Sequence, residues 1–376
     1  MRSDAVARRL TGQHMIAASL LPDLPAGARL LILRSRSIGD IILLTPSLRL
    51  LKEWRPDLRI SVMVESRFRE LLQGNAAVEE ILTPGEGSGL RKLLSRLAVI
   101  RGLRRRGFSI CVNLHGGPTS RLFARWSAAR WRVGFAHYRG TRLYNILVPD
   151  ARTILNQPSL HTAEHQAAAF FYLGLPRTEI PRAQIFFGAE HAVWWEAKRA
   201  SLGIAPGQAY AIVHPTALYK TKEWAAEGFA QIGEYLERQA RIAPIYSCGP
   251  GEAPVLDAVE KAAGAPVRRL EGVSLAQFAA ALAGARLFVG NDSGPAHMAA
   301  ALARPVVVIF GSSSSPIWGP WPQRGSSPRS RVVQNRFDCN PCPGDRCYQF
   351  PRPECILSVT FDQVKGAVEE VLAHSP

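Results

Sequence analysis

Hydrophobic and polar positions along the chain alternate in blocks that predict short strands followed by helices. In the first half, apolar runs typical of strands lie at 28–33, 59–66, 78–84, 108–117 and 132–137. The pattern restarts after residue 182, where the predicted strands are 210–216, 243–250, 286–292 and 305–311, and the predicted helices are 224–239, 252–264, 275–285 and 296–303. Strands that alternate with helices predict parallel sheets covered by helices on both faces.

Two such series in 376 residues indicate two doubly wound α/β domains with a cleft between them. The proline-containing stretch 174–184 is the predicted linker, which places the domains at 1–181 and 182–376. Residues 1–28 contain an apolar patch too interrupted for a signal peptide, and we expect a loosely ordered extension there. No apolar run approaches the roughly 20 residues that a membrane-spanning helix needs.

Charge narrows the partners that the chain can have. Lys and Arg number 46 against 30 Asp and Glu, a net charge of +16, which favours nucleic acid, anionic lipid surfaces or phosphorylated substrates. A generally basic surface with no specific partner is the alternative. Arginines gather at 101–107 and 120–142, but no RNA-binding signature, zinc-finger spacing or recognition helix accompanies them, so nucleic acid is the weakest of the three readings.

A polar cluster interrupts the apolar sequence at 289–302, between a predicted strand and a predicted helix. Its members are Asn291, Asp292, Ser293, Gly294 and His297. Ligands bind at the carboxyl ends of parallel strands, and a helix N-terminus there offers free N–H groups to an anion. The competing interpretation is that Asp292 or Ser293 caps the helix, with the glycine easing the turn.

Polar side chains also follow other predicted strands. Gly39 and Asp40 lie in the first strand-to-helix turn, where Asp40 is either a helix cap or a general base. The stretch 213–224 supplies His214, Thr216, Lys220 and Lys222, which could bind phosphate oxygens or form a solvated loop. Glu252, beyond a glycine-proline turn, could accept a hydrogen bond from a ribose hydroxyl or cap the next helix.

Several phosphate and metal motifs are missing from the sequence. It has no GxxxxGK loop, no GxGxxG after the first strand and no Asp-x-Asp pair, so a bound diphosphate would depend on lysines and helix N-termini. Four cysteines, Cys339, Cys342, Cys347 and Cys355, have the spacing C-x2-C-x4-C-x7-C. This set could bind zinc or form disulfides, but we expect a packed loop of reduced thiols.

Five stretches together resemble the heptosyltransferases of glycosyltransferase family 9, in the same order and over nearly the whole chain. They are 36–64, 112–117, 213–224, 289–302 and 339–364. The resemblance implies a GT-B architecture, in which two Rossmann-like domains face a central cleft. The N-terminal domain would bind the lipopolysaccharide core acceptor and the C-terminal domain ADP-heptose, and the last helix would pack back on the N-terminal domain.

The resemblance also implies residue roles. Asp40 matches the catalytic base, Lys222 a lysine that neutralises the donor phosphates, Thr216 a phosphate-binding hydroxyl, Glu252 a nucleoside contact and Asp292 the aspartate that binds heptose hydroxyls. Lys220 and Lys222 could exchange roles. The remaining donor-binding candidates are Ser293, Gly294 and His297.

The acceptor-binding candidates lie in the first domain. They are Gly39, His115, Arg121 and Arg139. We expect an inverting, metal-independent transfer of heptose from ADP-heptose to a lipopolysaccharide core precursor, with no cofactor and no nucleic acid partner. The predicted location is cytoplasmic, peripheral on the anionic inner face of the inner membrane. The alternatives are a GT-B transferase or epimerase with another nucleotide sugar, and a non-catalytic lipopolysaccharide-precursor-binding protein.

Overall fold

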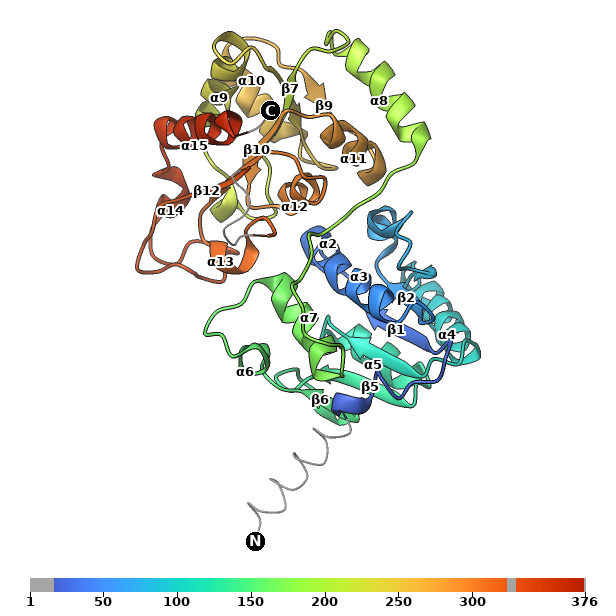
Figure 1. The fold of residues 1–376 in the computed structure, drawn as a ribbon. Coiled ribbons are helices and arrows are strands. Elements are labelled where there is room, and N and C mark those ends of the chain that lie inside the picture. Colours follow the sequence, from blue (N-terminus) through green and yellow to red (C-terminus); the bar gives the residue numbers. More distant parts are fainter. Residues whose placement is uncertain (1–16, 323–328, 375–376) are drawn as a thin grey trace. The chain divides into compact units, whose positions relative to one another are not determined.

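The computed structural model describes residues 17–322 and 329–374, and the chain divides into two compact units, residues 1–181 and 182–376 (Figure 1). The boundary between them falls within the stretch 174–184. Each unit is built around one six-stranded sheet whose strand pairs are all parallel. This is the α/β class that the alternation of strands and helices predicts.

The N-terminal unit has the strand order β3-β2-β1-β4-β5-β6. Its strands are β1 (Arg29–Leu33), β2 (Arg59–Met63), β3 (Glu80–Leu82), β4 (Ile110–Asn113), β5 (Trp131–Phe135) and β6 (Ile146–Val148). Its helices are α2 (Ile38–Ile42), α3 (Thr45–Trp54), α4 (Gly89–Arg105), α5 (Pro118–Trp126), α6 (Ala151–Leu155) and α7 (Thr162–Tyr172), with the 3-10 helices η1 (Ser66–Leu72) and η2 (Thr141–Leu143).

The C-terminal unit has the order β12-β11-β10-β7-β8-β9. Its strands are β7 (Tyr210–His214), β8 (Ala243–Ser247), β9 (Arg269–Leu270), β10 (Leu287–Asn291), β11 (Val306–Phe310) and β12 (Ser330–Gln334). Its helices are α8 (Ala189–Ser201), α9 (Ala226–Arg238), α10 (Ala253–Ala263), α11 (Leu275–Ala283), α12 (Gly294–Ala301), α13 (Ser315–Trp318), α14 (Glu354–Leu357) and α15 (Phe361–Ala373), with the 3-10 helix η3 (Lys220–Lys222).

Helices cover both faces of the C-terminal sheet, because its central strands are apolar on both sides. β7, β8, β10 and β11 are buried at every position. Helices α9, α10 and α15 contribute to one core with the sheet, whereas α11 contacts α8 and α12. Among the described residues, no helix is long and apolar enough to span a membrane.

The strands β6, β9 and β12 were not predicted from the sequence. They have two to five residues each and lie at or next to the edges of their sheets. Short edge strands need few apolar residues, since part of their surface faces solvent, so their sequences show no long apolar run.

The described part of the N-terminal extension is packed, which corrects the expectation of a loosely ordered segment. Ala17 and Leu21 are fully buried, and the Leu21 amide donates a hydrogen bond to the Leu173 carbonyl (2.9 Å). Gly174 has a φ of +102°, and a Cβ there would lie 2.2 Å from the Ala18 carbonyl oxygen. A glycine therefore lets the extension approach the end of α7 closely. Residues 1–16 lie outside the described residues.

The last helix packs its apolar face within the C-terminal unit, and its predicted contact with the N-terminal domain stays a prediction. The apolar face of α15, formed by Val364, Val368 and Val371, is fully buried in the core of the C-terminal unit. Contacts with α9, β11 and β12 surround it, and the Tyr235 hydroxyl donates to Glu369 Oε1 (3.2 Å). Ile356 and Val359, just before α15, are buried in the same core, so the valine stripe continues a segment that is already packed there.

Gly233 in α9 provides a test of this packing. An added Cβ would lie 1.7 Å from the hydroxyl oxygen of Tyr246, which is buried and donates to the Phe229 carbonyl (3.1 Å). We expect Gly233→Ala to lower the free energy of unfolding by roughly 2 kcal/mol, although alanine favours helices. The measurement is denaturant-induced unfolding.

Gly366 in α15 is the matched control, because nothing lies within 4 Å of the Cβ that alanine would add there. Gly366→Ala is expected to stabilise the protein by about 0.5–1 kcal/mol. Adding Tyr246→Phe to Gly233→Ala should restore part of the loss, since the hydroxyl makes the closest contact. Equal effects of the two glycine substitutions would contradict the packing described.

Candidate donor and catalytic sites

The C-terminal sheet reverses its strand order between β7 and β10, which lie side by side at its centre. From β7 the chain proceeds outward through β8 and β9, then returns to β10 on the other side. Crevices at such switch points, outside the carboxyl ends of the strands, are where open α/β sheets bind ligands. His214 ends β7 and Thr216 follows it, and Asp292 and Ser293 follow β10, so the sheet brings these predicted residues together.

Lys222 and Asp292 form an ion pair at this switch point. Nζ of Lys222 lies 2.8 Å from Oδ2 of Asp292, and the side chains are 22% and 7% exposed. They come from η3 and from the residue directly after β10, which are 70 positions apart in sequence. A lysine ammonium has three donor positions, so one bond to Asp292 leaves capacity for a second anion.

The N-terminus of α12 is open beside this pair. Ser293 is the N-cap residue by position, but its side chain makes no capping hydrogen bond, and its buried Oγ has no partner among the described residues. Asp292 is engaged with Lys222 instead. Helix capping therefore does not explain the polar cluster. Pro295 in the first turn has no N–H, and the Ala296 amide donates to the Ser293 carbonyl (3.2 Å), so the groups there that can meet an anion are the Gly294 amide and the Ser293 hydroxyl.

Gly294 begins α12, and His297 is buried on its first turn.

Asn291 was noted in the sequence but given no role, and the structure supplies one. Its side chain is fully buried; Oδ1 accepts from the Trp224 amide (3.1 Å), and Nδ2 donates to the Pro215 carbonyl (2.8 Å). Both ends of the loop that contains Lys222 are thus tied to the end of β10. An asparagine can make both bonds because it carries a donor and an acceptor.

His214 connects two strand ends through its ring nitrogens. Nε2 lies 2.9 Å from the Thr216 hydroxyl and Nδ1 2.9 Å from Ser247 Oγ, at the end of β8. Burial lowers the pKa of His214 to about 4, so the ring is neutral at neutral pH. Thr216 is itself almost fully buried, so the structure shows it as a partner of His214, and its phosphate contact stays a prediction.

The two candidate lysines differ in exposure and in ion-pair partner. Lys220 is 80% exposed and pairs with Glu223 on its own loop, whereas Lys222 is mostly covered and pairs across the switch point. Glu252 lies at the start of α10, where Oε2 accepts from the Gly249 amide (2.7 Å). This bond closes the turn before α10, and the Glu252 side chain makes no capping hydrogen bond to the helix, so both the capping role and the nucleoside contact stay predictions.

The N-terminal sheet has its own switch point, between β1 and β4. Asp40 lies in α2, after β1, and its carboxylate is 15% exposed. Oδ2 accepts from the Ser37 amide (3.0 Å) and hydroxyl (3.3 Å), while Oδ1 is paired with Arg34. Arg34 also donates to the Leu114 carbonyl, just beyond β4, so the arginine holds Asp40 at the junction of the two strands.

Asp40 is therefore part of a capping box, which is the structural role that the sequence left open. Three hydrogen bonds occupy its two oxygens, and a carboxylate offers about four acceptor sites. Its main chain is fixed as well, because Gln166 of α7 donates to the Asp40 carbonyl (3.0 Å). A capping role and a role as base are thus compatible in the same side chain.

The four acceptor-binding candidates differ in whether they lie near Asp40. His115 follows β4, near Asp40, and burial together with Arg34 and Arg36 lowers its pKa, which favours the neutral ring. Gly39 is buried in α2. Arg121 donates to the main-chain carbonyl of Arg139, whose side chain is exposed. Only His115 and Gly39 thus lie with Asp40 at the switch point, and all four roles stay predictions.

Sequence reasoning missed Arg34, Gln166 and His165. His165 stacks on Phe135 with ring centroids 4.4 Å apart, and burial lowers its pKa to about 4. Asp40 and Arg34 are near enough to act on that pKa electrostatically. Arg34 could have been found as the first polar residue after a predicted strand, but nothing in the sequence connects α7, some 126 positions later, with Asp40.

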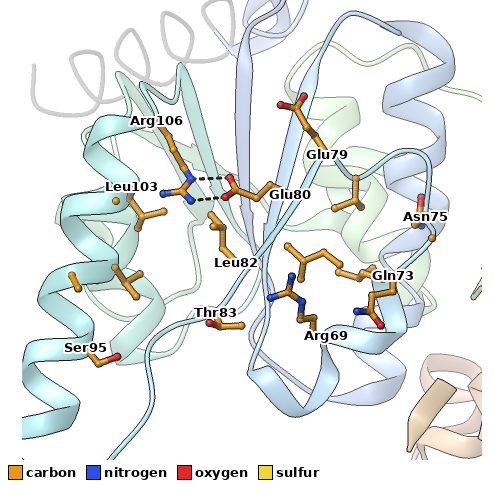
Figure 2. A pocket seen from close by; sticks show the side chains of 17 residues that line it. Arg69, Gln73, Asn75, Glu79, Glu80, Leu82, Thr83, Ser95, Leu103 and Arg106 are labelled. Carbon is orange, nitrogen blue, oxygen red and sulfur yellow. Dashed lines mark hydrogen bonds and ion pairs between the residues drawn. The ribbon is translucent and has the colours of Figure 1, made fainter. Parts of the chain in front are cut away.

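A cavity of about 700 Å³ lies elsewhere in the N-terminal unit, between η1, β3 and α4 (Figure 2). Leu103 and Arg106 line one side and Arg69 and Gln73 the other, with Arg106 paired to Glu80 of β3. None of the predicted site residues lines it. This cavity therefore lies away from the candidate site residues, which gather at the two switch points.

The four clustered cysteines are free thiols that line a cavity of about 70 Å³ together with Thr221 and Ser312. Burial and the three neighbouring cysteines raise the pKa of Cys355. Within residues 17–322 and 329–374, no group of three or more His, Cys, Asp and Glu side chains is arranged to hold a metal ion.

Comparison with known proteins agrees with this geometry. The model of glycosyltransferase family 9 (heptosyltransferase) matches residues 96–349. Lipopolysaccharide heptosyltransferase 3 of Escherichia coli K12 is 25% identical over 289 residues, which cover 75% of this chain and 82% of the relative.

Solved structures show the same fold. A family 9 glycosyltransferase from Veillonella parvula matches with a TM-score of 0.77 and 20% identity over 93% of this chain and 98% of its own. E. coli heptosyltransferase WaaC, solved with ADP-2-deoxy-2-fluoro heptose, matches with a TM-score of 0.64 and 21% identity over 91% and 99%. The predicted GT-B architecture of two α/β units is confirmed. Because the family model spans most of the chain, this protein belongs to the heptosyltransferases of glycosyltransferase family 9.

Proposed function

We propose that this glycosyltransferase moves a heptose from ADP-heptose to a core sugar of a lipopolysaccharide precursor, with inversion at the anomeric carbon and without a metal ion. The relatives named as lipopolysaccharide heptosyltransferases support the acceptor class. WaaC structures with ADP and with an ADP-heptose analogue support the donor class.

The observation that carries the proposal is the Lys222–Asp292 pair beside the open N-terminus of α12. A sugar nucleotide needs a cation and N–H donors for its diphosphate and a carboxylate for its sugar hydroxyls. Lys222, the first turn of α12 with the free Ser293 hydroxyl, and Asp292 supply these three functions within one switch point.

The transfer would be a single displacement. The acceptor hydroxyl oxygen attacks the anomeric carbon from the face opposite ADP while the carbon–oxygen bond to the diphosphate breaks. The hydroxyl proton passes to Asp40, whose carboxylate has a remaining acceptor position, and ADP leaves with the bonding electron pair. Arg34 fixes the carboxylate and takes no proton, because a guanidinium stays charged.

Metal independence rests on how the leaving group is stabilised. Negative charge grows on the diphosphate as its bond to the sugar breaks, and preorganised donors aimed at that charge lower the barrier. Lys222, the Gly294 amide and the Ser293 hydroxyl are such donors. The acceptor is carried on a lipid, and the net charge of +16 suits work at the anionic cytoplasmic face of the inner membrane.

The function is tested by incubating the protein with ADP-heptose and defined core acceptors. We expect an acceptor heavier by one heptose, an anomeric configuration opposite to that of the donor by NMR, and unchanged turnover after chelation by EDTA. Transfer from a UDP-sugar instead would replace the donor assignment. Binding of ADP-heptose, seen as a raised melting temperature, without any product would identify a non-catalytic binder.

Replacement of Asp40 by asparagine tests the base. Asparagine keeps an oxygen for the Ser37 amide but cannot accept the proton, so kcat should fall by roughly 100- to 10,000-fold. The Kd for ADP-heptose, measured by calorimetry, should change by less than about threefold, because the donor is bound by the other unit.

Ser37→Ala is the matched control, since it removes the hydroxyl that Asp40 accepts from but leaves the carboxylate. We expect a small loss of stability and near-normal turnover. If both variants reduce turnover equally, Asp40 acts only as a cap and the base lies elsewhere.

Lys222→Met should reduce kcat/KM for ADP-heptose on the order of 100-fold, because the donor phosphates lose their cation. Lys220→Met, two residues away and 80% exposed, should change it by no more than about threefold. Since Lys222→Met leaves the carboxylate of Asp292 without its cation, thermal unfolding of both variants is measured in parallel. The reverse ranking would assign the phosphate contact to Lys220.

A further inference from the structure

Helix α4 presents an unusual solvent face. Leu90, Leu93, Leu94 and Leu97 are spaced i, i+3, i+4 and i+7, so they form one stripe, and all four are among the exposed large hydrophobic residues. Leu90 is 70% exposed. Single exposed leucines are ordinary on protein surfaces, but a continuous stripe of them indicates an interaction site.

The same face becomes basic further along the helix. Arg101, Arg104 and Arg105 continue the leucine stripe by their helical positions, and all three are exposed. The helix contains no acidic residue. Glu79 and Glu80, on the neighbouring edge of the sheet, are paired with Arg59 and Arg106. The face therefore has an apolar half and a half whose positive charge no residue of the helix offsets.

Packing within the protein does not account for the stripe. Only Leu103 of α4 is buried, and Val99 and Ile100 complete the contact with the core of the unit. Ser95, Leu103 and Arg106 lie along the 700 Å³ cavity (Figure 2), and by helical spacing they are on the opposite side of the helix from the leucines.

The charges decide what the face can bind. Two copies of the chain that met through α4 would place the arginines against arginines or against leucines, with no carboxylate on the helix to pair them in either case. Nucleic acid would satisfy the arginines but leave four leucines unburied. An anionic lipid bilayer satisfies both halves, because the headgroups attract arginines and the acyl region takes up leucines.

We propose that α4 is a membrane-docking helix, which inserts Leu90, Leu93, Leu94 and Leu97 into an anionic leaflet while Arg101, Arg104 and Arg105 contact the headgroups. The inference deepens the proposed function, since it names the surface through which the enzyme reaches a lipid-anchored acceptor. It concerns residues that have no part in the donor or catalytic sites described above.

The test uses the full-length chain and sedimentation with vesicles of phosphatidylglycerol and phosphatidylethanolamine. We expect the double variant Leu90→Glu and Leu94→Glu to bind at least about tenfold more weakly than the wild type. Replacement of Arg101, Arg104 and Arg105 by glutamine should weaken binding on the order of 100-fold at low salt. Vesicles of phosphatidylcholine alone should bind the wild type weakly.

Val193 in α8 provides the matched control, since it is 72% exposed on a helix of the other unit. The double variant Ala192→Glu and Val193→Glu introduces two glutamates at exposed positions, as the leucine variant does, and it should leave vesicle binding unchanged. Equal binding by the wild type and the Leu90/Leu94 variant, or an equal loss in the control, would overturn the proposal. So would a wild-type dimer that the leucine variant converts to a monomer without affecting vesicle binding.

Heptose transfer to a lipid-free core acceptor separates the two proposals. The Leu90/Leu94 variant should retain wild-type turnover with that acceptor and lose turnover with the same acceptor presented on vesicles. Absence of transfer in the wild type would count against the proposed function, while the vesicle-binding result would still stand or fall by itself.

Discussion

The ion pair between Lys222 and Asp292 is the interaction on which the candidate donor site depends. Both groups are largely removed from water, and a pair in this position is stabilising only if its geometry is held and its remaining bonds are satisfied. Asn291 holds the geometry, because it ties both ends of the lysine's loop to the end of β10. The two charges then offset each other, and the ammonium keeps donor positions for a second anion.

The N-terminal unit repeats this arrangement with different chemistry. Arg34 joins the end of β1 to the segment after β4, and its guanidinium positions Asp40 between them. Arginine suits this place because it cannot donate its proton away, so the only group of the pair that can exchange a proton is the carboxylate. Lysine suits the donor site because a compact ammonium can turn between two anions. Each switch point thus has a cation–carboxylate pair, and the cation in each fits a different task.

The sequence predicted the repeating strand and helix pattern, and with it both sheets, because buried parallel strands are continuous apolar runs. It also predicted which turns hold polar groups, including Asp40, Lys222 and Asp292. It could not show that Ser247 faces His214 or that Gln166 reaches Asp40, since those contacts join segments that only the folded topology brings together. For the same reason, the stripe of Val364, Val368 and Val371 predicts an apolar face on the last helix but not the core into which that face packs.

The cysteine-rich loop acquires a physical role through its contacts with the donor loop. Thr221, next to Lys222, donates to the Gly344 carbonyl and accepts from the Ser312 hydroxyl (3.3 Å). A Cβ at Gly311 would lie 2.5 Å from the Thr221 carbonyl, so only glycine allows this approach. The four thiols line the small cavity behind Thr221 and Ser312, where polarisable sulfur fills an irregular space. Packing of this loop against Thr221 therefore helps to fix η3. The position of Lys222 depends in this way on residues more than a hundred positions further along the chain.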